Sequence, residues 1–330
     1  MKIDAHNHFY PEAFLVELEK QGSSIGITLE KDAWGRTIIV QNGNQVVTIT
    51  PPMKDIDIRL EDMERVGFDR QILTLSIPSV DIFPVESGEI LARVVNDEIA
   101  RICGDHPERF MAFATLPFRD PKRAVAELER CIDELGFCGA CIGSNICGIN
   151  LDNPIFYPFY ERISAYDLPV HIHPRPPRDR ETFKDYRLNP MIGFEVDLCV
   201  AVIRLVMGGV LEKFPNLKFI VSHLGGAIPY LAERIQNCYE AYPECRENIT
   251  APAMDYLKKF YYDTVSFFEP ALICAHAFAG AGHLVLGSDY PHVIGDIEEA
   301  ITSIENLKID AQEKEQIYSG NILRLIHQGR

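Results

Sequence analysis

Near its start the chain reads KIDAHNHFYP at residues 2–11, a strand-like run with two histidines spaced two apart. A short alternating run of this kind is typical of a buried β-strand. On a strand, His6 and His8 project from the same face, because successive side chains point to opposite faces. Neutral imidazoles bind zinc-like ions well, so this strand can supply half of a metal site. An HxH pair alone is a weak signal, because isolated pairs are more often incidental.

Similar runs recur along the chain, and each ends in polar loop residues. Eight strands are expected, near residues 3–8, 71–77, 110–116, 139–143, 169–173, 218–223, 260–265 and 283–288. Helical periodicity fills the gaps, near residues 58–66, 88–105, 121–135, 154–166, 198–213, 227–241, 270–278, 294–306 and 312–327. This alternation is the pattern of repeated βα units and a parallel sheet. Eight units without a flexible linker predict one α/β domain over residues 1–330, a closed (β/α)8 TIM barrel.

One stretch departs from the alternation. Residues 26–50 read as two or three short β segments, with turn signals at Trp34-Gly35 and Asn42-Gly43. They predict a small β-hairpin inserted after the first strand, at about residues 23–52. In a barrel this insertion would lie on the C-terminal face, over the active site. A surface hairpin with no part in the site is an equal alternative.

Composition limits the classes of partner. With 47% hydrophobic and 24% charged residues, the chain has the composition of a soluble globular protein. Its 32 basic and 48 acidic residues give a net charge of −16, which opposes binding to nucleic acid and to anionic membranes. A small anionic substrate stays compatible with this charge, because a metal ion and a few arginines can reverse the potential inside one cleft.

The predicted location is the cytoplasm. The first strand begins directly after Met1, which leaves no room for a secretory signal. No apolar stretch approaches the roughly 18 residues of a membrane span. Nine scattered cysteines, an odd number, are typical of reduced cytosolic thiols.

Further candidate residues lie at other strand ends. His173 closes the fifth predicted strand, His223 closes the sixth, and Asp289 follows the eighth. The carboxyl ends of barrel strands converge on one pocket. We therefore expect these three side chains to share a pocket with His6 and His8.

Four motifs carry a resemblance to a known family. They are KIDAHNHFYP at 2–11, VHIHPRP at 170–176, FPNLKFIVSHLGG at 214–226 and LVLGSDYP at 284–291. In this order they resemble the amidohydrolase-related (amidohydrolase 2) decarboxylase group, over nearly the whole chain. That group includes aminocarboxymuconate semialdehyde decarboxylase, γ-resorcylate decarboxylase and 5-carboxyvanillate decarboxylase. The HxH opening is closer to the semialdehyde enzyme, whereas HPRP resembles the aromatic-acid members.

The resemblance implies a site for one divalent metal. Its ligands would be His6, His8, His173 and Asp289, with His223 as a base beside them. His171 shares a strand face with His173, but the His-Pro match favours His173, and His171 is expected to be a hydrogen-bonded core residue. Two-metal members use a carboxylated lysine or a carboxylate after strand four, and residues 139–145 offer neither. Three histidines favour zinc, while an aspartate ligand and open positions would tolerate manganese.

The resemblance also implies residues for the substrate. In similar decarboxylases, the arginine at the place of Arg234 binds the substrate acid group, sometimes across a subunit interface, which implies a homodimer or higher oligomer. Arg234 pairing with a surface acid is the alternative. Arg175, directly after the His-Pro pair, is expected to reach the pocket. In the aromatic-acid members the aspartate at the place of Asp289 is thought to protonate the ring carbon, so Asp289 and His223 are the expected catalytic residues.

The expected function is therefore a metal-dependent, nonhydrolytic decarboxylase, a carbon–carbon lyase of a small aromatic or unsaturated oxo-carboxylic acid. One alternative is a metal-dependent hydrolase of a lactone, amide or related carbonyl compound, because a metal-activated water with His223 as base would attack a carbonyl. A second alternative is a catalytically silent barrel that binds a metal or a metabolite.

Overall fold

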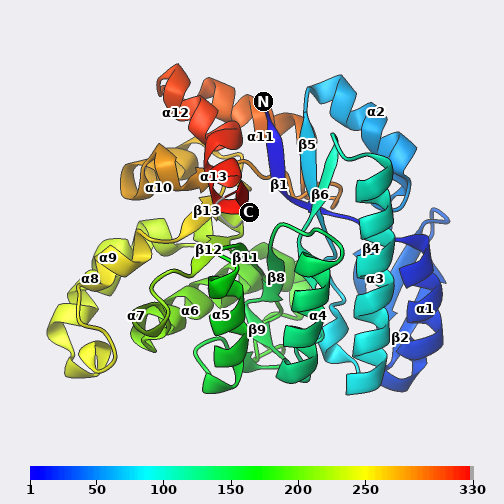
Figure 1. The fold of residues 1–330 in the computed structure, drawn as a ribbon, viewed down its shortest axis with the longest axis horizontal. Coiled ribbons are helices and arrows are strands. Elements are labelled where there is room, and N and C mark those ends of the chain that lie inside the picture. The colour runs from blue at the N-terminus through cyan, green and yellow to red at the C-terminus, as the bar shows by residue number, and fades with distance from the viewer. Residues whose placement is uncertain (328–330) are drawn as a thin grey trace. The chain divides into compact units, whose positions relative to one another are not determined.

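The computed structural model describes residues 1–327 (Figure 1). These residues form two compact units: Met1–Ala140 with Gly287–Glu299, and Cys141–Leu286 with the described chain from Ala300 onward. Both units mix helices with parallel strands. Within the described residues, no helix combines the length and the apolar character needed to cross a membrane.

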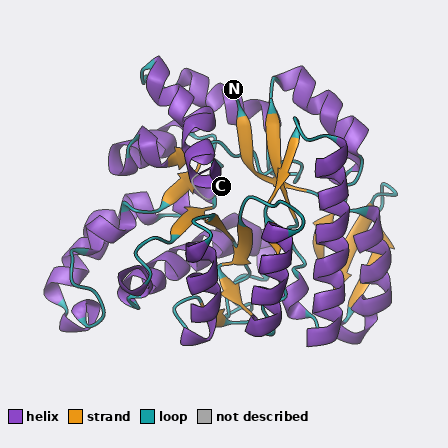
Figure 2. Cartoon of the chain, viewed as in Figure 1, coloured by secondary structure: helices purple, strands orange, loops and turns teal. Residues whose placement is uncertain are grey.

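The first unit is built on a three-stranded parallel sheet in the order β1, β5, β6 (Figure 2). All six residues of β1 are buried, as expected for a parallel strand that is covered on both faces. The strands are β1 (Ile3–His8), β5 (Arg70–Thr74) and β6 (Phe110–Ala112), followed by the short β7 (Ala114–Thr115). The helices are α1 (Glu12–Gly22), α2 (Ile56–Val66), α3 (Val85–Asp105) and α4 (Pro121–Asp133).

The ends of α2 and α4 have clear causes in the sequence. The carboxylate of Asp55 accepts hydrogen bonds from N–H groups in the first turn of α2, and Gly67 ends that helix in the left-handed conformation with φ of 83°. Asp120 caps α4 in the same way, and Pro121 occupies a first-turn position where its missing N–H costs nothing.

A three-stranded antiparallel sheet follows α1. Its strands are β2 (Ile27–Lys31), β3 (Thr37–Gln41) and β4 (Asn44–Thr48). Asn42 and Gly43 both have positive φ, 51° and 77°, which is the conformation of a tight hairpin turn. The strands lie in the range where short β segments were expected, and their place over an active site remains a prediction.

The second unit contains five strands in the order β14, β13, β12, β11, β8. These are β8 (Ala140–Gly143), β11 (Pro169–His173), β12 (Lys218–Val221), β13 (Tyr261–Asp263) and β14 (Leu284–Val285). A small antiparallel pair, β9 (Asn145–Ile146) and β10 (Ile149–Asn150), follows β8. The helices from residue 157 onward are α5 (Tyr157–Ala165), α6 (Phe194–Met207), α7 (Val210–Lys213), α8 (Ile228–Ala241), α9 (Ala253–Leu257), α10 (Glu269–Ala279), α11 (Ile297–Asn306), α12 (Ala311–Glu315) and α13 (Asn321–His327).

The predicted α/β alternation is confirmed, because a strand overlaps each of the eight expected ranges. Several strands end early, since the chain turns sharply after them. β12 ends at Val221, and both His223 and Leu224 adopt left-handed φ values of 53° and 54°. The helix expected at 198–213 divides at Gly209, whose φ is 73°. Closure of the strands into one barrel remains a prediction.

Candidate active site

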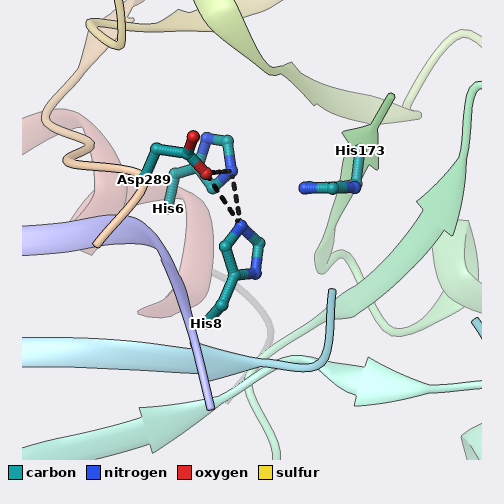
Figure 3. A group of neighbouring side chains, drawn as sticks. All are labelled: His6, His8, His173 and Asp289. Carbon is teal, nitrogen blue, oxygen red and sulfur yellow. Dashed lines mark hydrogen bonds and ion pairs between the residues drawn. The ribbon is translucent and has the colours of Figure 1, made fainter. Parts of the chain in front are cut away.

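In the first unit, main-chain hydrogen bonds bring the loop after β14 alongside β1. The N–H groups of Ser288 and Asp289 donate to the carbonyl of His6, at 3.1 and 2.9 Å. One step further along, the N–H of His8 donates to the carbonyl of Tyr290 at 2.7 Å. Asp289 itself has φ of 53°, a left-handed conformation that turns its side chain out of the extended path. The strand and the loop therefore present His6, His8 and Asp289 together (Figure 3).

The three side chains point at one another. The Nε2 atoms of His6 and His8 are 3.1 Å apart, and Oδ1 of Asp289 lies 3.1 Å from Nε2 of His8 and 3.4 Å from Nε2 of His6. Both histidines are fully buried, and Asp289 is 4% exposed. Donor atoms bound at roughly 2.0–2.2 Å to one ion lie about 3.0–3.5 Å apart in octahedral or tetrahedral geometry. These residues therefore fit a single small divalent metal ion.

Thr74 on β5 orients the ring of His8. Its hydroxyl donates to the carbonyl of Asn7 at 2.6 Å and lies 3.2 Å from Nδ1 of His8. Because its one proton is used on Asn7, the hydroxyl oxygen accepts from His8, which puts the imidazole proton on Nδ1. The lone pair of Nε2 then faces Asp289 and His6, as a metal ligand requires.

Two residues before His6 in the chain, a buried carboxylate, Asp4, joins the strand to the loop. It accepts hydrogen bonds from the Ser288 hydroxyl at 2.6 Å and from the Gln71 amide at 3.0 Å. It also accepts the main-chain N–H groups of His6 and Ser288, both at 3.2 Å. Burial raises the pKa of Asp4 to about 6, although the hydrogen bond from Ser288 opposes that rise. Asp4 thus ties β1 to the loop that carries Asp289.

A fully buried arginine, Arg59 on α2, supports the same strand end. It donates to the Asn7 side chain at 3.0 Å, to the Gln71 side chain at 2.8 Å and to the carbonyl of His8. Its guanidinium also lies 4.8 Å from the ring centre of Tyr290. Burial lowers the pKa of Arg59 to about 10, so the group stays charged at neutral pH. Arg59 was not among the residues expected from the sequence.

The loop after Asp289 places two more residues close by. His292 has its ring centre 4.8 Å from that of His8, and its Nε2 lies 3.0 Å from the hydroxyl of Ser76. Gly295 packs directly against the aspartate, because a Cβ at this position would lie 2.3 Å from the carbonyl oxygen of Asp289. This loop therefore has no room for a side chain at position 295.

In the second unit, His173 ends β11 and is 4% exposed. Its carbonyl accepts the N–H of Ser144 at 2.9 Å, which fixes this strand end beside β8. His171 is fully buried, and its Nε2 lies 3.0 Å from the Ser222 hydroxyl and 3.7 Å from a carboxylate oxygen of Asp263. His171 is thus the hydrogen-bonded core residue that was expected.

His223 lies in the turn after β12. The Asp263 carboxylate accepts its main-chain N–H at 2.8 Å. Nδ1 of its ring lies 2.7 Å from Oε1 of Glu195, a residue of α6 that was not expected in the site. The two residues are 28 positions apart in the sequence, so no local motif predicts the contact.

The two predicted substrate arginines differ in their surroundings. The main-chain N–H of Arg175 donates to the Ser144 hydroxyl at 2.8 Å, and its side chain covers Gly143, where a Cβ would lie 2.4 Å from the guanidinium Nε. Arg175 is therefore at the carboxyl end of β8. Arg234, in contrast, is exposed on α8.

Comparisons with known proteins agree along the chain. A family model described as amidohydrolase matches residues 3–327. The chain is 30% identical over 330 residues to 2-amino-3-carboxymuconate-6-semialdehyde decarboxylase of Dictyostelium discoideum, covering 99% of this chain and 91% of that protein. It is 33% identical over 297 residues to γ-resorcylate decarboxylase of a Polaromonas species, covering 83% and 88%.

The fold resembles solved structures of similar enzymes. One is a dihydroxybenzoic acid decarboxylase of a Polaromonas species with bound manganese and the inhibitor 2-nitroresorcinol. The two chains match with a TM-score of 0.80 and 28% sequence identity, and the match covers 100% of this chain and 97% of the other.

Proposed function

Because the chain belongs to the amidohydrolase family, we propose that it is a metal-dependent, nonhydrolytic decarboxylase of a small aromatic or unsaturated oxo-carboxylic acid. The observation that carries the proposal is the convergence of His6, His8 and Asp289 on one point in the first unit. The relatives described above, which are named as decarboxylases, support the reaction type. The enzyme is thus a carboxy-lyase.

The proposed metal site adds His173 as the fourth ligand. His173 is supported by its place at the carboxyl end of a parallel strand and by its burial, and its neighbour His171 is engaged with Ser222 in the core. Three imidazoles favour zinc, although manganese suits the carboxylate, and manganese is the metal in the Polaromonas structure. Bound there, a single divalent ion would polarise a substrate oxygen and stabilise the negative charge that develops as CO2 leaves.

Asp289 and His223 are the proposed proton-transfer residues. In decarboxylation the bond to the carboxylate breaks, CO2 leaves, and the electron pair on the carbon takes up a proton. Asp289 is proposed to bring that proton to the carbon. His223 is proposed as the base, because it is part of a half-buried pair with Glu195 that can hold an added proton.

Arg175 and Arg234 are the proposed partners of the substrate carboxylate. A planar guanidinium matches a carboxylate with two parallel hydrogen bonds. Arg175 is supported by its position at the carboxyl end of β8. Arg234 is exposed on α8, so a contact with substrate is easiest to explain in a homodimer or higher oligomer in which α8 faces a second subunit.

We further propose that both units belong to one (β/α)8 barrel, a single domain over residues 1–330 with β2, β3 and β4 as an insertion after the first strand. The full-length match to a dihydroxybenzoic acid decarboxylase supports this architecture. A cytoplasmic location is proposed from the nine free cysteines. The net charge of −16 argues against nucleic acid or a membrane surface as partner.

The test is an assay of protein purified without chelators. Metal analysis is expected to find one divalent ion per chain. A panel of hydroxybenzoic and unsaturated oxo-carboxylic acids is then assayed in D2O, and the expected result is CO2 release with one deuterium at the carbon that lost the carboxylate.

Other outcomes would replace the proposal. Ring opening of lactones or cleavage of amides, with oxygen taken from labelled water, would identify a hydrolase. Stoichiometric metal without turnover across the panel would identify a silent metal-binding barrel. Full turnover after exhaustive removal of metal would contradict the metal-dependent mechanism itself.

A further inference from the structure

The ring of His223 is held by a residue from another element. Nδ1 of His223 and Oε1 of Glu195 are 2.7 Å apart, the separation of a hydrogen bond to a charged group. The His223 side chain is 12% exposed and that of Glu195 is 31% exposed. The pair is therefore largely shielded from bulk water, but solvent can still reach it.

The backbone around this pair leaves little freedom of movement. The N–H of His223 is bound to the Asp263 carboxylate, and the turn continues through Gly225 and Gly226, which have φ of 74° and 64°. A Cβ at Gly226 would lie 2.5 Å from the carbonyl oxygen of Glu195, and one at Gly225 would lie 2.6 Å from the ring of Tyr262. The turn is thus seated directly against the first turn of α6, which keeps the backbone positions of His223 and Glu195 close together.

We propose that Glu195 is a positioning residue for His223: its carboxylate accepts the Nδ1 proton, fixes the ring in one orientation and one tautomer, and leaves Nε2 to take up and return a proton. The inference rests on the proposed function, in which His223 is the base. When Nε2 takes up a proton, the imidazolium forms beside the carboxylate, while the Nδ1 proton stays on Nδ1. No bond to Glu195 changes in this step.

Neighbouring elements carry other titratable groups around the turn. They include Asp263 and Tyr262 on β13, Cys199 on α6, His171 on β11, Glu269 on α10, and Glu233 and Arg234 on α8. Asp263 contacts the main chain of His223, and Tyr262 donates its hydroxyl to the carbonyl of Leu257. Burial raises the pKa of the Cys199 thiol, which accepts the N–H of Ala227. Glu195, in contrast, contacts the imidazole itself.

The test is ¹⁵N-histidine NMR of the metal-loaded full chain, with the His223 signals assigned from a His223→Asn variant. In the wild-type protein we expect the proton of neutral His223 on Nδ1. In Glu195→Gln, which keeps the shape and removes the charge, we expect the pKa of His223 to fall by roughly one unit. We also expect kcat to fall about 10- to 100-fold with a smaller change in KM. Glu161→Gln, at an exposed glutamate on α5, is the matched control and should change neither the pKa of His223 nor kcat.

Several results separate this inference from the proposed function. A wild-type His223 with its proton on Nε2, or an unchanged His223 pKa and kcat in Glu195→Gln, would overturn the positioning role even in an active decarboxylase. The expected tautomer and pKa change in a chain that decarboxylates nothing would support the role of Glu195 and contradict the proposed function. If Glu195→Ala does not fold, the isosteric Glu195→Gln still decides the question.

Discussion

The two groups of site residues are held in different ways. In the first unit, His6, His8 and Asp289 are almost completely buried, and main-chain hydrogen bonds between β1 and the loop that carries Asp289 fix their positions. In the second unit, His223 and Glu195 are partly exposed, and their side chains contact each other directly.

This contrast matches two chemical tasks. A metal ligand needs donor atoms at fixed distances, and a buried hydrogen-bond network enforces them. A proton-transfer group must be stable both with and without its proton and must reach the substrate, which a partly exposed pair allows. Changes in the first unit are therefore expected to alter metal content, and changes around His223 are expected to alter turnover with the metal retained.

The largest effect is expected from His8→Ala. This change removes one donor atom of the proposed metal site, so metal content should fall to about a tenth or less. Turnover should fall by more than about 100-fold, because losing even a residue that only hydrogen-bonds to a metal ligand lowers affinity or activity roughly 10- to 100-fold. Elemental analysis and kcat measure both. His276→Ala on α10, where the ring pairs with Glu313, is the control and should keep metal and activity. A fully metallated His8→Ala protein would contradict the ligand assignment.

His223→Asn should lower turnover without lowering metal content. Loss of a general base typically costs about 10²- to 10⁴-fold in kcat, while the three converging ligand atoms of the first unit are untouched. Metal content should therefore stay at the wild-type level. If this variant also loses its metal, the proposed division of tasks between the two groups is wrong.

Arg59→Met tests the network beside the ligands. The change removes the donors to Asn7, Gln71 and the His8 carbonyl. Each buried acceptor that is left without a donor costs about 1–3 kcal/mol, and denaturant unfolding would measure the sum as a lower free energy of unfolding.

The control for this change is Arg101→Met. Arg101 is exposed on α3 and forms ion pairs with Glu98 and Asp105 of the same helix. Its loss should cost less than about 1 kcal/mol. Equal losses in the two variants would show that Arg59 is no more than a packing residue.

The smallest effect is expected from Thr74→Val. Valine keeps the shape but cannot accept the Nδ1 proton of His8, so the ring loses its preferred tautomer. Metal affinity should fall about 10-fold, within the range for residues that orient a ligand, and competition with a chelator measures it. Thr28→Val, on an exposed part of β2, provides the comparison. Unchanged affinity would show that Thr74 does not set the tautomer.

The sequence predicted residues that a local pattern identifies. His6, His8, His171 and His173 follow from alternation on a strand, and Asp289 from its place after a strand-like run. Arg59 and Glu195 escaped prediction because the site residues they contact, His8 and His223, lie 51 and 28 residues away, so no spacing rule connects them. A signal for Arg59 did exist: it shares the buried stripe of α2 with Met63, where a charged residue is rarely found without partners.

Two local features were also missed. Helix α1 was not expected, although its buried Phe14, Leu15 and Leu18 have helical spacing. The strands expected to reach residues 223 and 288 end earlier, because His223 and Asp289 take left-handed conformations that are uncommon outside glycine. The N–H of His223 donates to the Asp263 carboxylate, and the N–H of Asp289 donates to the carbonyl of His6. These long-range hydrogen bonds stabilise the two conformations, and a strand pattern contains no information about them.

Gly295 has a consequence for reading the natural variation of this enzyme. A residue without a side chain is seldom counted among those that hold a metal, yet any added carbon here would displace the Asp289 backbone and with it the carboxylate. In a library randomised at this one codon and selected for turnover, glycine alone should survive. A homologue with any other amino acid there is expected either to have a different loop conformation or to bind no metal ion at this place.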